Sequence, residues 1–80
     1  MSFFDDLKNG SSFHRIVPAG SGGFSLECSD AAREGRIQFV SLAKEAIERA
    51  AEEGYEVIHE HNSARDSLGL DRVVFAKLSN

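Results

Sequence analysis

A single amphipathic helix with a clear start and a clear end is the feature of this sequence that most constrains its fold. Residues 42–53 place apolar side chains, four of them alanine, on one helical face and charged side chains on the other. Ser41 is a good N-cap, and Gly54 stands where helices commonly end. Because alanine lets a helix axis approach a sheet closely, the pattern predicts a helix packed on a β-sheet.

Two strand-like segments follow this helix. Residues 55–61 and 72–78 are rich in β-forming side chains. The polar stretch 62–71 between them is too long for a tight turn. We therefore expect two strands joined by a loop.

A β-hairpin is predicted before the helix. Residues 13–17 are rich in β-formers and end at Pro18, which cannot donate to a sheet ladder. Residues 24–28 alternate apolar and polar side chains, and the glycine-rich segment 19–23 suits a hairpin loop. Alternation over residues 37–39 indicates one further short strand.

The N-terminal residues form a short helical turn in this interpretation. Ser2 is placed to cap it, and Phe3, Phe4 and Leu7 then share one face. We expect this face to dock on the core. The alternative is an arm whose two phenylalanines are exposed and bind a partner.

The whole chain, residues 1–80, is predicted to be one α+β domain with a mostly antiparallel sheet of four or five strands. The main helix covers one face of the sheet, and the N-terminal turn is added to it. A chain of 80 residues buries only roughly 60–65% of its unfolded surface, and the second sheet face stays wet unless something covers it. We therefore expect a homodimer formed through the sheet.

Composition favours a soluble cytoplasmic protein. Cys28 is the only cysteine, so no internal disulfide is available, which fits a reducing compartment. The first residues lack the pattern of a signal peptide, and no window approaches 18 apolar residues, so no membrane contact is predicted.

No catalytic residue and no cofactor site is predicted. The glycine-rich residues 20–23 lead into a strand, whereas phosphate-binding glycine loops lead into a helix, and they lack the Walker and Rossmann spacings. No sequence pattern pairs a serine with a histidine as in a triad. The carboxylate pairs Asp5-Asp6 and Glu52-Glu53 are expected to be solvated.

The histidines allow three interpretations. His59 and His61 lie two apart in a predicted strand, so their imidazoles share a face, as two metal ligands do. A zinc site needs a further ligand, for which His14 and Cys28 are the candidates, although Cys28 shares a face with apolar residues and is expected to pack with them. The other two interpretations are a polar strand near a sheet edge and an interface that loosens near pH 6.

Four arginines fall in or beside predicted loops: Arg33, Arg36, Arg65 and Arg72. If the fold brings these loops together, the arginines form a basic lip that contacts nucleic acid. The alternative is four scattered surface arginines. The net charge of −4, without any run of basic residues, disfavours nucleic acid as a partner.

Several short segments together show a resemblance to a known family. They are Ile16-Val17-Pro18, Gly23-Phe24-Ser25-Leu26, Phe39 with Ser41, Glu45-Ala46-Ile47 and Val57-Ile58-His59. In this order they resemble a family of small bacterial domains of unknown function. The resemblance implies a ββαβ core over about residues 13–61 and no activity. The chain departs from the family at Phe24, where tryptophan is usual, and its last strand lies outside the shared region.

Three functional hypotheses follow. The first is a non-enzymatic, self-associating interaction module that also binds an unidentified protein partner through Phe3, Phe4, Tyr55, His59 and His61. The second is a nucleic-acid-associated regulator that uses the four arginines. The third is a small metal-binding protein or enzyme centred on His14, His59 and His61.

Overall fold

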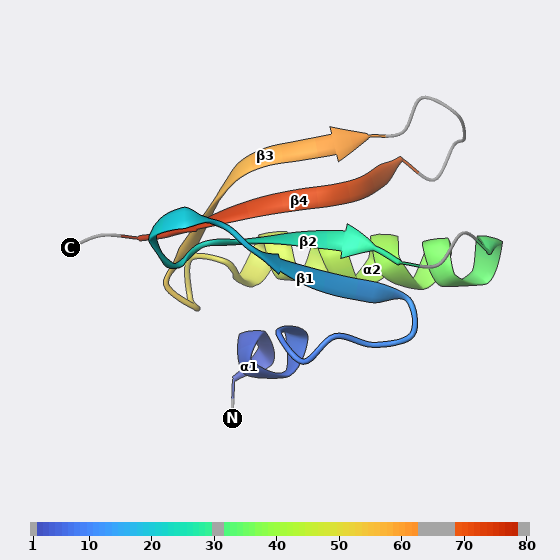
Figure 1. Cartoon of the computed structure of the whole chain (residues 1–80), viewed down its shortest axis with the longest axis horizontal. Coiled ribbons are helices and arrows are strands. Elements are labelled where there is room, and N and C mark those ends of the chain that lie inside the picture. The colour runs from blue at the N-terminus through green and yellow to red at the C-terminus, as the bar shows by residue number, and fades with distance from the viewer. Residues whose placement is uncertain (1, 30–31, 63–68, 79–80) are drawn as a thin grey trace.

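The structure is a computed structural model that describes residues 2–29, 32–62 and 69–78. Along the chain these residues form α1 (Phe3–Leu7), β1 (His14–Pro18), the 3-10 turn η1 (Gly20–Gly22), β2 (Phe24–Cys28), α2 (Arg33–Arg49), β3 (Tyr55–Asn62) and β4 (Leu70–Lys77). The four strands pair antiparallel in the spatial order β1-β2-β4-β3 (Figure 1). The predicted α+β architecture is confirmed, with its antiparallel sheet, main helix and N-terminal turn.

The sheet joins two hairpins through their second strands. β4 pairs with β2 on one side and with β3 on the other, so β1 and β3 are the edge strands. The strands on either side of the predicted loop 62–71 extend into that range, because Asn62 belongs to β3 and Leu70 begins β4. Residues 63–68 of that predicted loop lie outside the described residues.

The main helix begins earlier than the sequence pattern suggested. α2 starts at Arg33, so the strand predicted over residues 37–39 is wrong, and Ser41 lies inside the helix rather than at its cap. The reason is a longer apolar stripe. Its buried members are Gly35, Phe39, Ala43, Ala46 and Ala50, which recur at helical spacing and extend the face by two turns.

The end of α2 also differs from the prediction. Ala50 is the C-cap, and Gly54 lies four residues further on with φ of +85°. The intervening turn is closed by Tyr55 N–H, which donates to the Ala50 carbonyl at 2.9 Å. Gly54 therefore supplies the left-handed backbone that starts β3 rather than ending the helix directly.

One face of the sheet, here called the inner face, carries the core. Phe24 stands opposite Phe75 and Leu26 opposite Val73, and all four are at most 3% exposed. The buried stripe of α2 belongs to the same hydrophobic cluster. The helix on sheet packing predicted from the alanines is therefore present.

The N-terminal turn docks on this inner face. Ser2 caps α1 as predicted, since its hydroxyl accepts from Asp5 N–H at 3.1 Å and the Asp5 carboxylate accepts from Ser2 N–H. The Phe4 ring centroid lies 5.4 Å from that of Phe75 and 5.2 Å from that of Tyr55. Both helices thus cover one face of the sheet, and no described helix covers the other face.

Candidate functional site

The uncovered side of the sheet, here called the outer face, is organised in two cross-strand rows. In the charged row, each residue stands opposite the next across all four strands: Arg15 of β1, Glu27 of β2, Arg72 of β4 and His61 of β3. The neighbouring central row is built in the same way from Val17, Ser25, Val74 and His59. Because facing side chains in antiparallel strands lie close together, each row is a continuous strip of contacts.

A bulge in β3 places the two histidines on this outer face. Val57 stands opposite Phe75 on the inner face, but His59 stands opposite Val74, which leaves Ile58 as an extra residue. Simple alternation would have put both histidines on the side of Val57. The ring centroids of His59 and His61 are 6.3 Å apart, so the prediction that they share a face is confirmed.

A second irregularity lies in β4. His61 stands opposite Arg72 while Asn62 stands opposite Leu70, so Asp71 is the extra residue here. Its Oδ1 lies 2.5 Å from His61 Nδ1. The bulge therefore brings a carboxylate to the end of the charged row.

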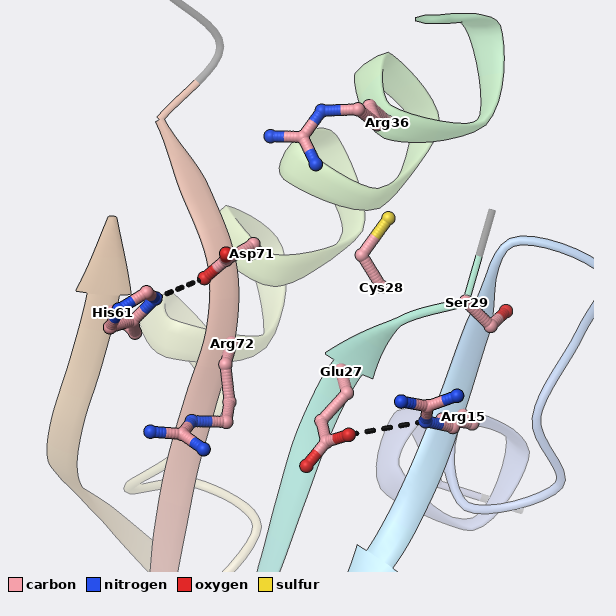
Figure 2. Close-up of a pocket in the computed structure, with 8 residues that line it drawn as sticks. All are labelled: Arg15, Glu27, Cys28, Ser29, Arg36, His61, Asp71 and Arg72. Carbon is pink, nitrogen blue, oxygen red and sulfur yellow. Dashed lines mark hydrogen bonds and ion pairs between the residues drawn. The ribbon is translucent and has the colours of Figure 1, made fainter. Parts of the chain in front are cut away.

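A hollow of about 490 Å³ opens at this end of the sheet, where β2 and β3 finish (Figure 2). α2 contributes Arg36 to its wall. The other lining residues come from the sheet and from the residue after β2: Arg15, Glu27, Cys28, Ser29, His61, Asp71 and Arg72. Among these described lining residues, three arginines face two carboxylates, which gives them a formal charge of +1 when His61 is neutral.

The two carboxylates of the hollow are held by neighbours. Glu27 Oε1 accepts from Arg15 Nε at 3.1 Å, and its Oε2 accepts from Ser25 Oγ at 3.3 Å. Asp71 is bound to His61. Within the described part of the chain, the Arg72 side chain makes no hydrogen bond or ion pair, although it lies between Glu27 and His61 (Figure 2). Arg72 is thus a cation available to a ligand.

The predicted basic lip forms only in part. Arg36 and Arg72 line the hollow, while Arg33 is exposed at the start of α2 and does not. Arg65 lies outside the described residues. Arg15 joins the hollow without having been predicted. The pairing of Arg15 with Glu27 could have been predicted from the sequence, because the two residues lie six positions before and six positions after Ser21, the centre of the hairpin.

The structure does not bring together the three histidines considered as metal ligands. His14 lies in β1 and His59 and His61 in β3, at opposite edges of the sheet. His14 is 5% exposed, and its Nδ1 and Nε2 already pair with Ser11 Oγ and the Leu7 carbonyl at 2.7 and 2.8 Å. Among the described residues, no group of three or more His, Cys, Asp or Glu side chains is placed to hold a metal ion.

The predicted interaction residues divide into buried and exposed ones. Phe4 and Tyr55 are 1% and 7% exposed, because they pack on Phe24 and Phe75, so neither offers a surface contact. Phe3 is half-buried, with the Arg49 guanidinium 5.0 Å from its ring. His59 and His61 are exposed on the outer face.

Cys28 packs as the sequence predicted and has a second position-dependent feature that was not predicted. It is half-buried and packs against the core cluster, as expected for a small apolar side chain, and it also forms part of the wall of the hollow. Cys28 is the last residue of β2 and comes after Phe24 and Leu26 on the inner face, which places it both beside the core and at the end of the sheet.

Comparison with protein-family models, with curated proteins and with solved structures finds no match for this chain. The resemblance to small bacterial domains therefore stays a prediction. Neither of the α-helices in the described ranges is long and apolar enough to cross a membrane.

Proposed function

We propose that this domain is a non-enzymatic interaction module that self-associates through the outer face of its sheet. The observation that carries this proposal is the one-sided covering of the sheet by α1 and α2. On the open side Val17 is 40% exposed, and Ile58 at the β3 bulge is 58% exposed. Burial of such apolar side chains against another surface is favourable.

A second copy of this chain is the partner that fits the outer face best. The charged row alternates in sign, from Arg15 through Glu27 to Arg72. When two such rows stack in opposite directions about a twofold axis between β2 and β4, Glu27 of each copy meets Arg72 of the other. A twofold contact of this kind is self-complementary.

The size of the outer face predicts a weak dimer. Four strands with rows of normal spacing offer roughly 300 Å² in projection. Stable specific interfaces bury about 800 Å² per partner. We therefore expect an association that depends on protein concentration rather than a permanent dimer, and the same surface remains accessible to a different protein partner.

Sedimentation velocity over a concentration series tests this proposal. The wild-type mass should rise with concentration, and Val17→Glu should abolish the rise because it buries a charge at the contact. Ile37→Glu is the matched control, since Ile37 is 46% exposed on α2 and lies outside both rows. A wild-type protein that stays monomeric at millimolar concentration would contradict self-association.

Nucleic acid is less well supported as a partner. Three of the four arginines predicted to contact it belong to the described residues, and of these three Arg36 and Arg72 lie together at the hollow while Arg33 does not. Their neighbours Glu27 and Asp71 lower the local positive potential that phosphate backbones need. The reducing cytoplasm remains our proposed location, because Cys28 is the only cysteine of the sequence and no internal disulfide is available.

A further inference from the structure

We infer that the hollow at the end of the sheet binds a phosphate monoester carried on a small polar molecule, with Arg15, Arg36 and Arg72 as its phosphate-binding side chains. This site shares Arg15 and Arg72 with the charged row of the proposed self-association, whereas Val17, on which that association is tested, lies in the central row and does not line the hollow. Three guanidiniums reach one hollow from three separate elements, β1, α2 and β4 (Figure 2). Guanidinium groups match phosphate oxygens with pairs of charge-assisted hydrogen bonds.

The charges inside the hollow favour an anion over a cation. A cation would need free carboxylate oxygens, but Glu27 is held by Arg15 and Ser25, and Asp71 by His61. Arg72 is the lining cation that makes no hydrogen bond or ion pair among residues 2–29, 32–62 and 69–78.

The size and chemistry of the walls indicate what carries the phosphate. The hollow holds about 490 Å³, which is within the range of roughly 300–1,000 Å³ common for small-molecule sites. Its walls are polar, with the Ser29 hydroxyl and the Cys28 thiol beside the charged groups, and the described residues that line it include no Phe, Tyr or Trp. A sugar phosphate therefore fits better than a nucleic acid, whose bases need aromatic platforms to stack on.

The test is a titration of the full chain with ribose 5-phosphate at low salt, followed by amide chemical shifts. We expect saturable shifts at the residues that line the hollow, and none with ribose alone. Arg72→Gln should weaken binding about tenfold, as expected for the loss of one charge-assisted hydrogen bond. Arg33→Gln is the matched control, because Arg33 is an exposed arginine outside the hollow.

Each other result overturns the proposal. Absence of saturable shifts at millimolar ligand excludes the site. Equal weakening by Arg72→Gln and Arg33→Gln shows that only net charge matters. A single-stranded DNA oligonucleotide that binds more tightly than ribose 5-phosphate makes nucleic acid the ligand instead. Val17→Glu, which lies outside the hollow, should not weaken the binding even though it prevents self-association, so failure of one proposal is distinguishable from failure of the other.

Discussion

The two hairpins of the sheet differ in how regularly they pair. β1 and β2 are in simple register around Ser21, so each residue of one strand faces the residue expected from its distance to the turn. β3 and β4 are interrupted twice, at Ile58 and at Asp71. The regular hairpin supplies the Arg15–Glu27 pair, and the irregular hairpin turns His59 and His61 to the open side. Functional side chains on this sheet are thus positioned as much by bulges as by strands.

The largest expected effect is on the free energy of unfolding, and it comes from comparing an inner-face with an outer-face residue of the same strand. Phe75→Ala should lower the free energy of unfolding by about 3–5 kcal/mol, because it empties a fully buried site. Val74→Ala, one residue earlier and on the outer face, should cost clearly less. Urea unfolding measures both. Equal costs would show that the outer face is covered in solution, which would favour the dimer.

The second prediction concerns the regular hairpin, at the close approach of β2 to β4. A Cβ at Gly23 would lie 2.4 Å from the Phe75 carbonyl oxygen. Gly23→Ala should therefore destabilise the protein by about 1–3 kcal/mol through backbone displacement. Gly20→Ala is the matched control, since a Cβ there meets nothing within 4 Å. A neutral Gly23→Ala variant in thermal unfolding would refute this close packing.

The third prediction compares histidines of the two edge strands. His14 hydrogen-bonds to the Leu7 carbonyl and so ties α1 to β1. His14→Leu should cost about 1–3 kcal/mol by leaving that carbonyl unsatisfied, and it should raise amide exchange in α1. The exposed His59→Leu should change stability by less than about 0.5 kcal/mol. Amide hydrogen exchange of α1 measures the difference between the two variants. Equal protection of α1 in both would contradict the stabilisation of α1 by the His14 hydrogen bond.

The smallest effect is expected from the ion pair in the charged row. The Arg15 side chain is 62% exposed, so Arg15→Gln should cost less than about 1 kcal/mol, and the cost should shrink with added salt. Thermal unfolding at low and high salt measures it. A larger cost that does not depend on salt would mean that the row is desolvated, as it would be in a tight dimer.

Local patterns predicted most of the secondary structure. The alternation of residues 24–28, Pro18 at the end of the first strand and Ser2 as the cap of α1 all correspond to what the chain forms. The start of α2 was misjudged because three residues of alternating polarity fit a helix as well as a strand. Phe39 then resolves the ambiguity, since it is fully buried only when it continues the helical stripe.

The candidate site was predicted less well than the fold. Arg36 and Arg72 were recognised as loop-side arginines, but nothing local to either residue indicated that they line one hollow. The histidines were correctly expected to share a face, although simple alternation assigned them to the side of Val57. Phe4 and Tyr55 were considered for partner binding and are instead part of the aromatic core.

By itself the sequence determined the class of each long element and the regular hairpin, because side-chain period and turn chemistry act over a few neighbouring residues. Only the tertiary structure decided the strand order, the two bulges and the open face. These depend on which distant segments pair: β4 lies between β2 and β3, and this order brings Arg72 between Glu27 and His61. The charged row is therefore a product of long-range pairing, since its four members come from four separate strands.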